Sequence, residues 1–239
     1  MTAMIFAAGL GTRLKPLTDT MPKALVPLAG KPLLQWQVEK LRDAGITDII
    51  VNVHHFPDQI INAIRTNKGW GCNIVVSDER DCLLDTGGGL RKAIHSPLTF
   101  HLSPLLACNV DILSNIDIRD FVRAYEQTGV SQLVVSDRKT QRYLCFDEND
   151  HLCGWTNIAT GEVKGQDGRH LAFSGMQILS PETLRQLNTM PESKFSLIDF
   201  YLRVMNTVPL RAFVPSDYRM MDVGKIDQLA EAETFAENL

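Results

Sequence analysis

Residues 4–18 read Met4-Ile5-Phe6-Ala7-Ala8-Gly9-Leu10-Gly11-Thr12-Arg13-Leu14-Lys15-Pro16-Leu17-Thr18. An apolar run ends in glycines, and basic side chains follow at Arg13, Lys15 and Lys23. This pattern predicts a buried strand whose following loop brings backbone N–H groups to an anion, because glycine lets a ligand approach the main chain. Arginine can hold a phosphate through two N–H groups, whereas lysine acts as a movable point charge.

Two common phosphate-binding loops do not fit these residues. The dinucleotide fingerprint G-x-G-x-x-G requires a third glycine where Leu14 stands, which disfavours a nicotinamide-dependent oxidoreductase. The Walker loop requires G-K-[ST] after four spacer residues, and that pattern is absent. Taken alone, Gly9 and Gly11 are also compatible with an ordinary turn.

The whole string resembles the signature of the sugar-1-phosphate nucleotidyltransferases, A-A-G-x-G-[ST]-R-[LM]-x-P-L-T followed by P-K-x-L-x-P-[LV]-x-G-[KR]-P. The second half is present here as Pro22-Lys23-Ala24-Leu25-Val26-Pro27-Leu28-Ala29-Gly30-Lys31-Pro32. The resemblance extends over nearly the whole chain. It implies an enzyme that joins an NTP to a sugar 1-phosphate with Mg²⁺ and releases pyrophosphate.

The composition is that of a soluble globular protein, with 239 residues, 44% of them hydrophobic and 22% charged. The net charge of -4 argues against general nucleic-acid binding. No signal segment and no apolar run long enough to span a bilayer is found, so we expect a cytoplasmic protein without a membrane partner. The five cysteines form no C-x-x-C pair, and we expect reduced thiols rather than a structural zinc site.

Strand and helix patterns alternate through the first half of the chain. The expected strands are 3–8, 48–53, 73–77, 104–110 and 132–136, and the expected helices are 32–44, 57–65, 86–94 and 116–127. This alternation predicts a single-domain, Rossmann-like α/β fold with a mixed, mainly parallel sheet flanked by helices. Ligands of such sheets lie beyond the carboxyl ends of the strands, where Gly9, Gly11 and Asp111 fall.

The rhythm changes in the second half, where short strand-like runs are separated by glycine-bearing turns. We expect a nucleotide-binding part at about 1–136 and a small antiparallel insertion on the sugar side at about 137–215. A C-terminal part at 216–239 follows, in which a metal-binding loop at 220–224 leads into a helix at 225–235.

Two aspartates stand out as metal ligands. Asp111 follows a buried strand, and Asp222 precedes Gly224 and a helix. Each alone is more often a helix cap or a loop acid, but together they fit Mg²⁺, which prefers one or two protein carboxylates. They correspond to the aspartates of the family motifs N-G-D (or G-D) and W-x-D-[IV]-G-[ST]. Val110 and Lys225 depart from those motifs.

The resemblance and the chemistry together suggest roles for the remaining residues. We expect Lys23 to neutralise the α-phosphate and the attacking sugar phosphate, Arg13 to bind the leaving pyrophosphate, and Asp111 to complete the catalytic set. Leu84 to Gly89 resembles a family segment, L-[EG]-T-[GA]-G-[GA], that touches nucleobase and ribose in relatives. Its glycines predict a slot for a planar base, with a flexible helix start as the alternative. The expected nucleotide-binding residues are Ala8, Gly9, Gly11, Thr12, Arg13, Lys23, Glu79, Thr86, Gly87 and Asn109.

For the sugar phosphate, the resemblance points to Asn157, Ser174, Gly175 and Asp199, and Phe173-Ser174-Gly175 matches the family's F-[ST]-G. Asn157 and Asp199 are also compatible with a turn residue and a helix N-terminal acid. His54 and His55 lack metal-ligand spacing and are expected to be structural or solvent-facing.

The subfamily is the least specific part of the resemblance. The compact length and the run from Thr86 to Gly89 most resemble N-acetylmuramate-1-phosphate uridylyltransferases. Mannose-1-phosphate guanylyltransferases and phosphocholine cytidylyltransferases use much the same scaffold and stay open as alternatives. The lack of trailing hexapeptide repeats argues against a bifunctional acetyltransferase. A non-catalytic nucleotide-sugar sensor is the alternative from another class, motivated by Val110 and Lys225. The oligomeric state is left open.

Overall fold

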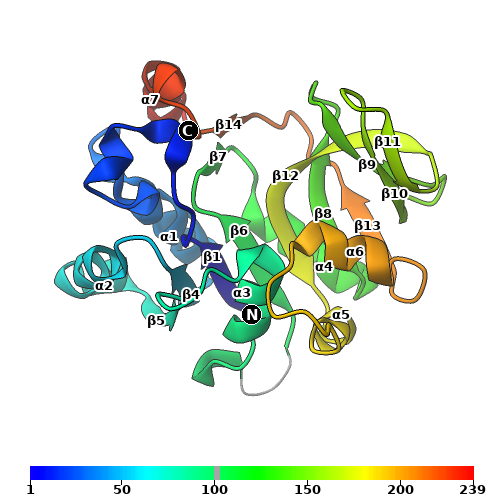
Figure 1. The fold of residues 1–239 in the computed structure, drawn as a ribbon, viewed down its shortest axis with the longest axis horizontal. Helices are drawn as coiled ribbons and strands as arrows, with labels where there is room; N and C mark the ends of the chain where they lie inside the picture. Colours follow the sequence, from blue (N-terminus) through cyan, green and yellow to red (C-terminus); the bar gives the residue numbers. More distant parts are fainter. Residues whose placement is uncertain (100–102) are drawn as a thin grey trace.

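The computed structural model describes residues 1–99 and 103–239. One large mixed sheet carries the fold, with strand order β11-β10-β9-β12-β6-β1-β4-β5 and with β8 and β13 attached beside β12 (Figure 1). The strands are β1 (Thr2–Phe6), β2 (Pro27–Leu28), β3 (Lys31–Pro32), β4 (Asp48–Val53), β5 (Asn73–Asp78), β6 (Leu105–Asn109), β7 (Ile112–Ser114), β8 (Ser131–Ser136), β9 (Arg142–Phe146), β10 (Leu152–Asn157), β11 (Glu162–Gly165), β12 (Arg169–Leu179), β13 (Leu210–Phe213) and β14 (Met220–Asp222). The α-helices are α1 (Leu33–Asp43), α2 (Pro57–Thr66), α3 (Asp85–Ala93), α4 (Ile118–Thr128), α5 (Pro181–Leu187), α6 (Leu197–Val204) and α7 (Leu229–Glu237). The short 3-10 helices are η1 (Thr12–Leu14), η2 (Leu17–Asp19), η3 (Lys23–Leu25), η4 (Lys68–Gly71), η5 (Pro97–Thr99) and η6 (Ile226–Gln228).

The first half of the chain is built on the parallel strands β6, β1, β4 and β5. Alternate side chains of β1 enter different cores, as the two-residue period of a strand requires. Ala3 and Ile5 pack in the cluster that contains α1, whereas Met4 and Phe6 pack in the cluster that contains α3. Because helices cover both faces, this strand is apolar throughout, which is the pattern from which it was predicted.

The antiparallel part of the sheet belongs to the second half of the chain. β12 pairs antiparallel with β6, β8 and β9, and the β9–β10–β11 hairpins extend the sheet outward, at the upper right of Figure 1. The pairing of β12 with β8 shifts register between Phe173 and Gln177, where Gly175 has a φ of 69°. The predicted mixed, mainly parallel central sheet flanked by helices is confirmed.

The C-terminal part differs from its prediction in one important element. Residues 220–224 were expected to form a loop, but β14 pairs antiparallel with β7. Strands of three residues are too short to show a period, so the sequence carried no signal for this ribbon. The last α-helix begins at Leu229 rather than at Lys225, because η6 comes first.

Within the described ranges, no helix is both long enough and apolar enough to cross a membrane. All five cysteines are free thiols, as expected.

Candidate functional site

The β7–β14 ribbon brings together the two predicted metal ligands, which are distant in the sequence. Asp111 immediately precedes β7, and Asp222 ends β14 opposite Ile112. The backbone N–H of Val223 donates to the carbonyl oxygen of Asp111 at 2.8 Å. The structure therefore places both carboxylates at one end of a single ribbon.

Helix α1 holds this ribbon in place. Gln37 Nε2 donates to the carbonyl oxygen of Ile112 at 2.7 Å, and Lys40 Nζ donates to Ser114 Oγ at 2.9 Å. Burial lowers the pKa of Lys40 to about 8, because the interior disfavours its charged form. Polar side chains of an otherwise apolar helix face thus fix the backbone that follows Asp111.

Charges of both signs gather around the two acids. Lys23 is only 8% exposed and forms an ion pair with Asp111 Oδ2. The pKa of Asp222 is raised, first by partial loss of hydration in the cleft and then by the negative charge of Asp111, while Lys23 and Arg13 oppose this shift. The charge of Asp111 opposes the ionisation of Asp222, and a cation bound between the two carboxylates would relieve that repulsion.

Gly224 leaves room for Arg13 beside the second acid. A methyl group at position 224 would lie 2.6 Å from Asp222 Oδ1 and 2.9 Å from Arg13 Nη2. The glycine therefore permits the guanidinium and the carboxylate to approach one another over the backbone.

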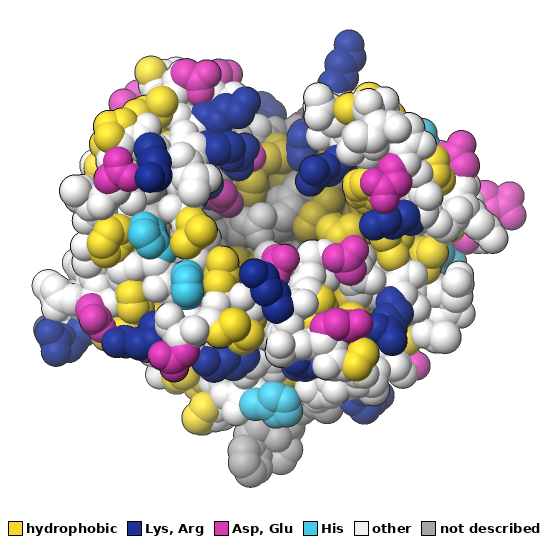
Figure 2. Space-filling model, in the orientation of Figure 1, with side chains coloured by type: hydrophobic (Ala, Val, Ile, Leu, Met, Phe, Trp, Pro, Cys, Tyr) yellow, Lys and Arg dark blue, Asp and Glu magenta, His cyan; other side chains and the backbone are white. Residues whose placement is uncertain are grey.

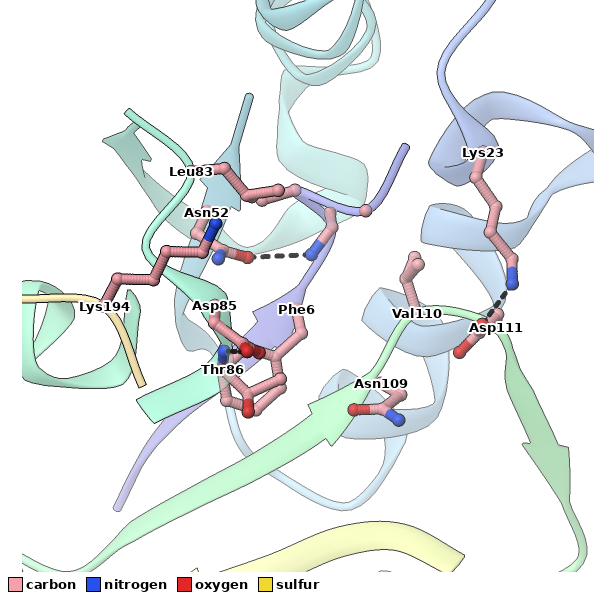
Figure 3. Close-up of a pocket in the computed structure, with 13 residues that line it drawn as sticks. Phe6, Lys23, Asn52, Leu83, Asp85, Thr86, Asn109, Val110, Asp111 and Lys194 are labelled. Carbon is pink, nitrogen blue, oxygen red and sulfur yellow. Dashed lines mark hydrogen bonds and ion pairs between the residues drawn. The ribbon is translucent and has the colours of Figure 1, made fainter. Parts of the chain in front are cut away.

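A cleft of about 430 Å³ opens on one side of Asp111 (Figure 3). Its lining residues are Phe6, Ala7, Ala8, Gly9, Lys23, Asn52, Leu83, Asp85, Thr86, Asn109, Val110, Asp111 and Lys194. Five of the predicted nucleotide-binding residues are among them: Ala8, Gly9, Lys23, Thr86 and Asn109. A side chain at Gly9 would meet no atom within 4 Å, so the backbone there faces open space.

A second hollow, of about 890 Å³, is lined by Asp222. Its other lining residues are Arg13, Arg138, Lys139, Thr140, Gln141, Arg142, Tyr143, Leu144, Trp155, Phe173, Ile198 and Lys225. Figure 2 shows the molecule hollowed in the middle of this face, with Lys and Arg side chains on both sides of the hollow. Asp111 thus lines the cleft, and Asp222 lines the second hollow.

The comparisons with known proteins identify the family of this chain. The sequence model of the family described as "Nucleotidyl transferase" matches residues 2–238. The chain belongs to the nucleotidyl transferase family. An N-acetylmuramate alpha-1-phosphate uridylyltransferase of Neisseria meningitidis serogroup B is 32% identical over 243 residues, covering 99% of this chain and 98% of its own. A mannose-1-phosphate guanyltransferase of Emericella nidulans is 30% identical over 197 residues, covering 81% of this chain and 53% of its own. The crystal structure of HddC from Yersinia pseudotuberculosis complexed with GMP-PN has a TM-score of 0.79 at 26% identity and covers 98% of this chain and 99% of its own.

The prediction of an enzyme that transfers nucleotidyl groups is therefore confirmed, and a nicotinamide oxidoreductase is excluded. Several residues of this nucleotidyltransferase nevertheless lie elsewhere than their predicted roles require.

Glu79 was expected to contact the base, but its side chain is 2% exposed. Its carboxylate accepts from Asn52 Nδ2 at 2.8 Å and from the backbone N–H of Leu84 at 3.1 Å. Asn52 Oδ1 in turn accepts from the backbone N–H of Ala7 at 2.8 Å. Glu79 therefore links the ends of β1, β4 and β5 to the start of α3 through hydrogen bonds. It stabilises the backbone around the cleft without being accessible from it.

The glycine run is not the open slot that the sequence suggested. Gly87, Gly88 and Gly89 are buried in the first turns of α3. The space beside the first two is filled by residues 193–195, and a methyl group at Gly89 would lie 2.7 Å from Glu79 Oε1. The Gly87 N–H donates to the carbonyl oxygen of Phe195 at 2.9 Å, so these glycines serve close packing of the helix rather than base insertion.

Gly11 and Thr12, which were also predicted to bind the nucleotide, line neither the cleft nor the second hollow. Gly11 has a φ of 65°, and a methyl group there would lie 2.8 Å from Thr18 Cγ2. Thr18 Oγ1 donates to the carbonyl oxygen of Gly11 at 2.8 Å. Thr12 begins η1 and is exposed.

None of the four predicted sugar contacts is among the lining residues of the second hollow. Asn157 Oδ1 accepts from the backbone N–H of Ala159 at 3.1 Å, which makes it a turn residue. Asp199 accepts from Ser196 Oγ at 2.7 Å at the start of α6, so it is a helix-capping acid. Ser174 is 1% exposed, so its side chain is not accessible to a ligand.

Gly175, the fourth predicted sugar contact, lies against Asn109, a cleft residue. A methyl group at Gly175 would be 2.8 Å from Asn109 Nδ2. The F-S-G segment therefore shapes the cleft through its backbone.

Seven lining residues of the cleft were not among the predicted contacts: Phe6, Ala7, Asn52, Leu83, Asp85, Val110 and Lys194. Asn52 lies near the carboxyl end of β4, so the strand-end rule could have found it. Lys194 reaches the cleft from the segment between α5 and α6, and nothing in its local sequence distinguishes it from a surface lysine.

Both histidines, expected to be structural or solvent-facing, contact backbone: His54 Nδ1 lies 2.7 Å from the carbonyl oxygen of Glu79, and His55 Nε2 lies 3.3 Å from that of Thr18. Among the described residues, the ligand-type atoms of Cys145, Asp167 and His170 lie within 4.8 Å of one another, at the β9–β12 pairing.

Proposed function

We propose that this enzyme transfers a uridylyl group from UTP to N-acetylmuramate 1-phosphate, forming UDP-N-acetylmuramate and pyrophosphate. The observation that carries a two-substrate reaction is the position of Asp111 and Asp222, which lie on one ribbon and line different hollows. The Neisseria meningitidis relative supports the choice of uridine and of this acceptor, because the similarity covers nearly the full length of both chains.

The residues suit direct displacement at phosphorus. In the proposed reaction an oxygen of the sugar phosphate attacks the α-phosphorus of UTP, and the bond between that phosphorus and the bridging oxygen of the β-phosphate breaks. The electron pair leaves with pyrophosphate, so no protein nucleophile is needed. Lys23 and Arg13 neutralise phosphate oxygens as charge shifts, which is the main requirement of such chemistry.

Asp111 and Asp222 would hold the divalent cation, which we propose is Mg²⁺. The donor set fits, because two carboxylates meet at one end of the β7–β14 ribbon and Mg²⁺ prefers one or two protein carboxylates. When bound, the ion supplies positive charge to the phosphate oxygens. Lys23, now paired with Asp111, is the chain's own cation at the same place.

A second candidate is guanylyl transfer to mannose 1-phosphate. The Emericella nidulans relative and the GMP-PN complex of HddC favour it. A non-catalytic sensor is less well supported, because both carboxylates, Lys23 and Arg13 are present in the lining of the two hollows.

Pyrophosphate release from a panel of NTPs and sugar 1-phosphates, with phosphocholine included, tests the proposal. UTP with N-acetylmuramate 1-phosphate should give the highest kcat/KM, and Asp111→Asn should lower it by roughly 100-fold or more. GTP with mannose 1-phosphate as the best pair would replace the proposed substrates. Tight nucleotide binding without turnover on any pair would instead indicate a sensor.

A further inference from the structure

The second hollow carries more positive charge than the phosphates of the proposed reaction require. Five basic side chains line it against one acid, Asp222, although the chain as a whole has a net charge of -4. Among the ion pairs of the described residues, none joins Lys139, Arg142 or Lys225 to an acid. Cations gathered in a concave surface without protein partners favour an anionic ligand.

These cations come from different parts of the chain. Arg13 lies beside Asp222, and Lys225 follows in the same turn after Gly224, so both belong to the end of the hollow where the phosphates react. Lys139 and Arg142 belong to the segment that enters β9 in the antiparallel insertion. The proposed phosphate chemistry assigns this second pair no role.

The surroundings of Arg142 indicate what it contacts. Arg142 and Leu144 are two residues apart on β9 and leave the sheet on the same face, and Trp155 of β10 lies directly opposite Leu144. Phe173 and Ile198 complete this largely apolar wall of the hollow. Arg142 is exposed and stands at the edge of a surface suited to the ring of a sugar.

We propose that Arg142, assisted by Lys139, binds a second acidic group of the acceptor, a carboxylate carried by the sugar away from its 1-phosphate. This inference rests on the proposed function and names the group that selects the acceptor. In N-acetylmuramate 1-phosphate that group is the carboxylate of the lactyl ether, which N-acetylglucosamine 1-phosphate lacks. Arginine suits this contact because its planar fork matches a carboxylate with two hydrogen bonds.

This pair of acceptors allows a direct test with UTP and the whole enzyme. The wild-type protein should use N-acetylmuramate 1-phosphate with a kcat/KM about 10-fold or more above that for N-acetylglucosamine 1-phosphate. Arg142→Gln should lower kcat/KM for the carboxylated acceptor by about 10- to 100-fold, the range of a charge-assisted hydrogen bond, and leave N-acetylglucosamine 1-phosphate within about threefold. Arg142→Lys should fall between, because it keeps the charge without the fork.

The matched control is Arg185→Gln, an exposed arginine of α5 outside both hollows, which should change neither acceptor. An equal loss with both acceptors in Arg142→Gln, or no preference in the wild type, would overturn the inference. A rise in the KM for UTP would assign Arg142 to the pyrophosphate instead and overturn it too. These outcomes leave nucleotidyl transfer intact, whereas absence of pyrophosphate with UTP and either acceptor would refute the proposed function itself.

Discussion

Replacing Asn52 with alanine should destabilise this enzyme strongly, although Asn52 is neither a metal ligand nor a phosphate contact. The change removes two buried hydrogen bonds, each 2.8 Å long, to the backbone N–H of Ala7 and to Glu79 Oε1. A buried N–H without a partner costs about 1–3 kcal/mol, and a carboxylate that loses one donor costs about 1.5–3 kcal/mol. Allowing for non-additivity, we expect the free energy of unfolding to fall by about 3–5 kcal/mol, a large share of the roughly 5–15 kcal/mol of a typical domain.

Urea unfolding followed by tryptophan fluorescence measures this loss, with an unchanged m-value as the condition for comparing midpoints. The matched control is Asn67→Ala, whose exposed Nδ2 bonds only to the carbonyl oxygen of Ala63, and it should cost at most about 1 kcal/mol. Affinity for UTP should also fall in Asn52→Ala, because Asn52 anchors the strand end that leads to Gly9. If both variants unfold at the same urea concentration, the proposed role of the Asn52–Glu79 contact is wrong.

Three further predictions concern the acid pair, a glycine and a lysine. Asp111→Asn should lower kcat by roughly 100-fold or more while circular dichroism shows an intact fold, because it removes charge at the reacting phosphates and little packing; near-normal turnover would remove Asp111 from the site. Gly175→Ala should lower the free energy of unfolding in urea by about 2 kcal/mol and weaken nucleotide binding, because the φ of Gly175 is 69° and the added methyl group would press on Asn109. The control Gly161→Ala has a φ of 72° and open space around it. It should cost only the backbone strain of about 1 kcal/mol and leave nucleotide binding unchanged. The pKa of Lys40 falls from 10.5 in the unfolded chain to about 8 in the folded protein, so between pH 8 and 10.5 the unfolded chain binds one proton more than the folded protein. The free energy of unfolding should therefore rise by at most about 3 kcal/mol from pH 8 to 10.5. Lys40→Met should abolish this rise in unfolding curves measured across that pH range.

The sequence predicted those features that depend on local pattern. The parallel core followed from apolar runs alternating with helical spacing, and the position of Asp111 followed from the strand before it. The same reasoning failed for Glu79 and for the glycines of α3. The sequence around a single carboxylate or glycine does not show whether that residue faces solvent or packs against a segment distant in the chain. Only the fold shows that residues 193–195 occupy the space beside Gly87.

Long-range pairing explains the other limit of prediction. The β7–β14 ribbon unites residues about a hundred positions apart through strands of three residues each, and no periodicity marks them. The family resemblance identified both acids without identifying the ribbon. The hydrogen bonds from Gln37 and Lys40 could not be predicted for the same reason. They join α1 to β7, a strand that the sequence did not predict.

The two departures from the family motifs have different consequences. Val110 is 4% exposed, packs in the core beneath α1, and donates its N–H to the carbonyl oxygen of Phe6 at 3.2 Å, so it fits the strand end without displacing Asp111. Lys225 is exposed and lines the second hollow, where it adds a cation next to Asp222. Val110 is accommodated by core packing, whereas Lys225 increases the positive charge of the second hollow. Neither removes a group that the proposed reaction needs, so the departures favour a change of acceptor over a loss of catalysis.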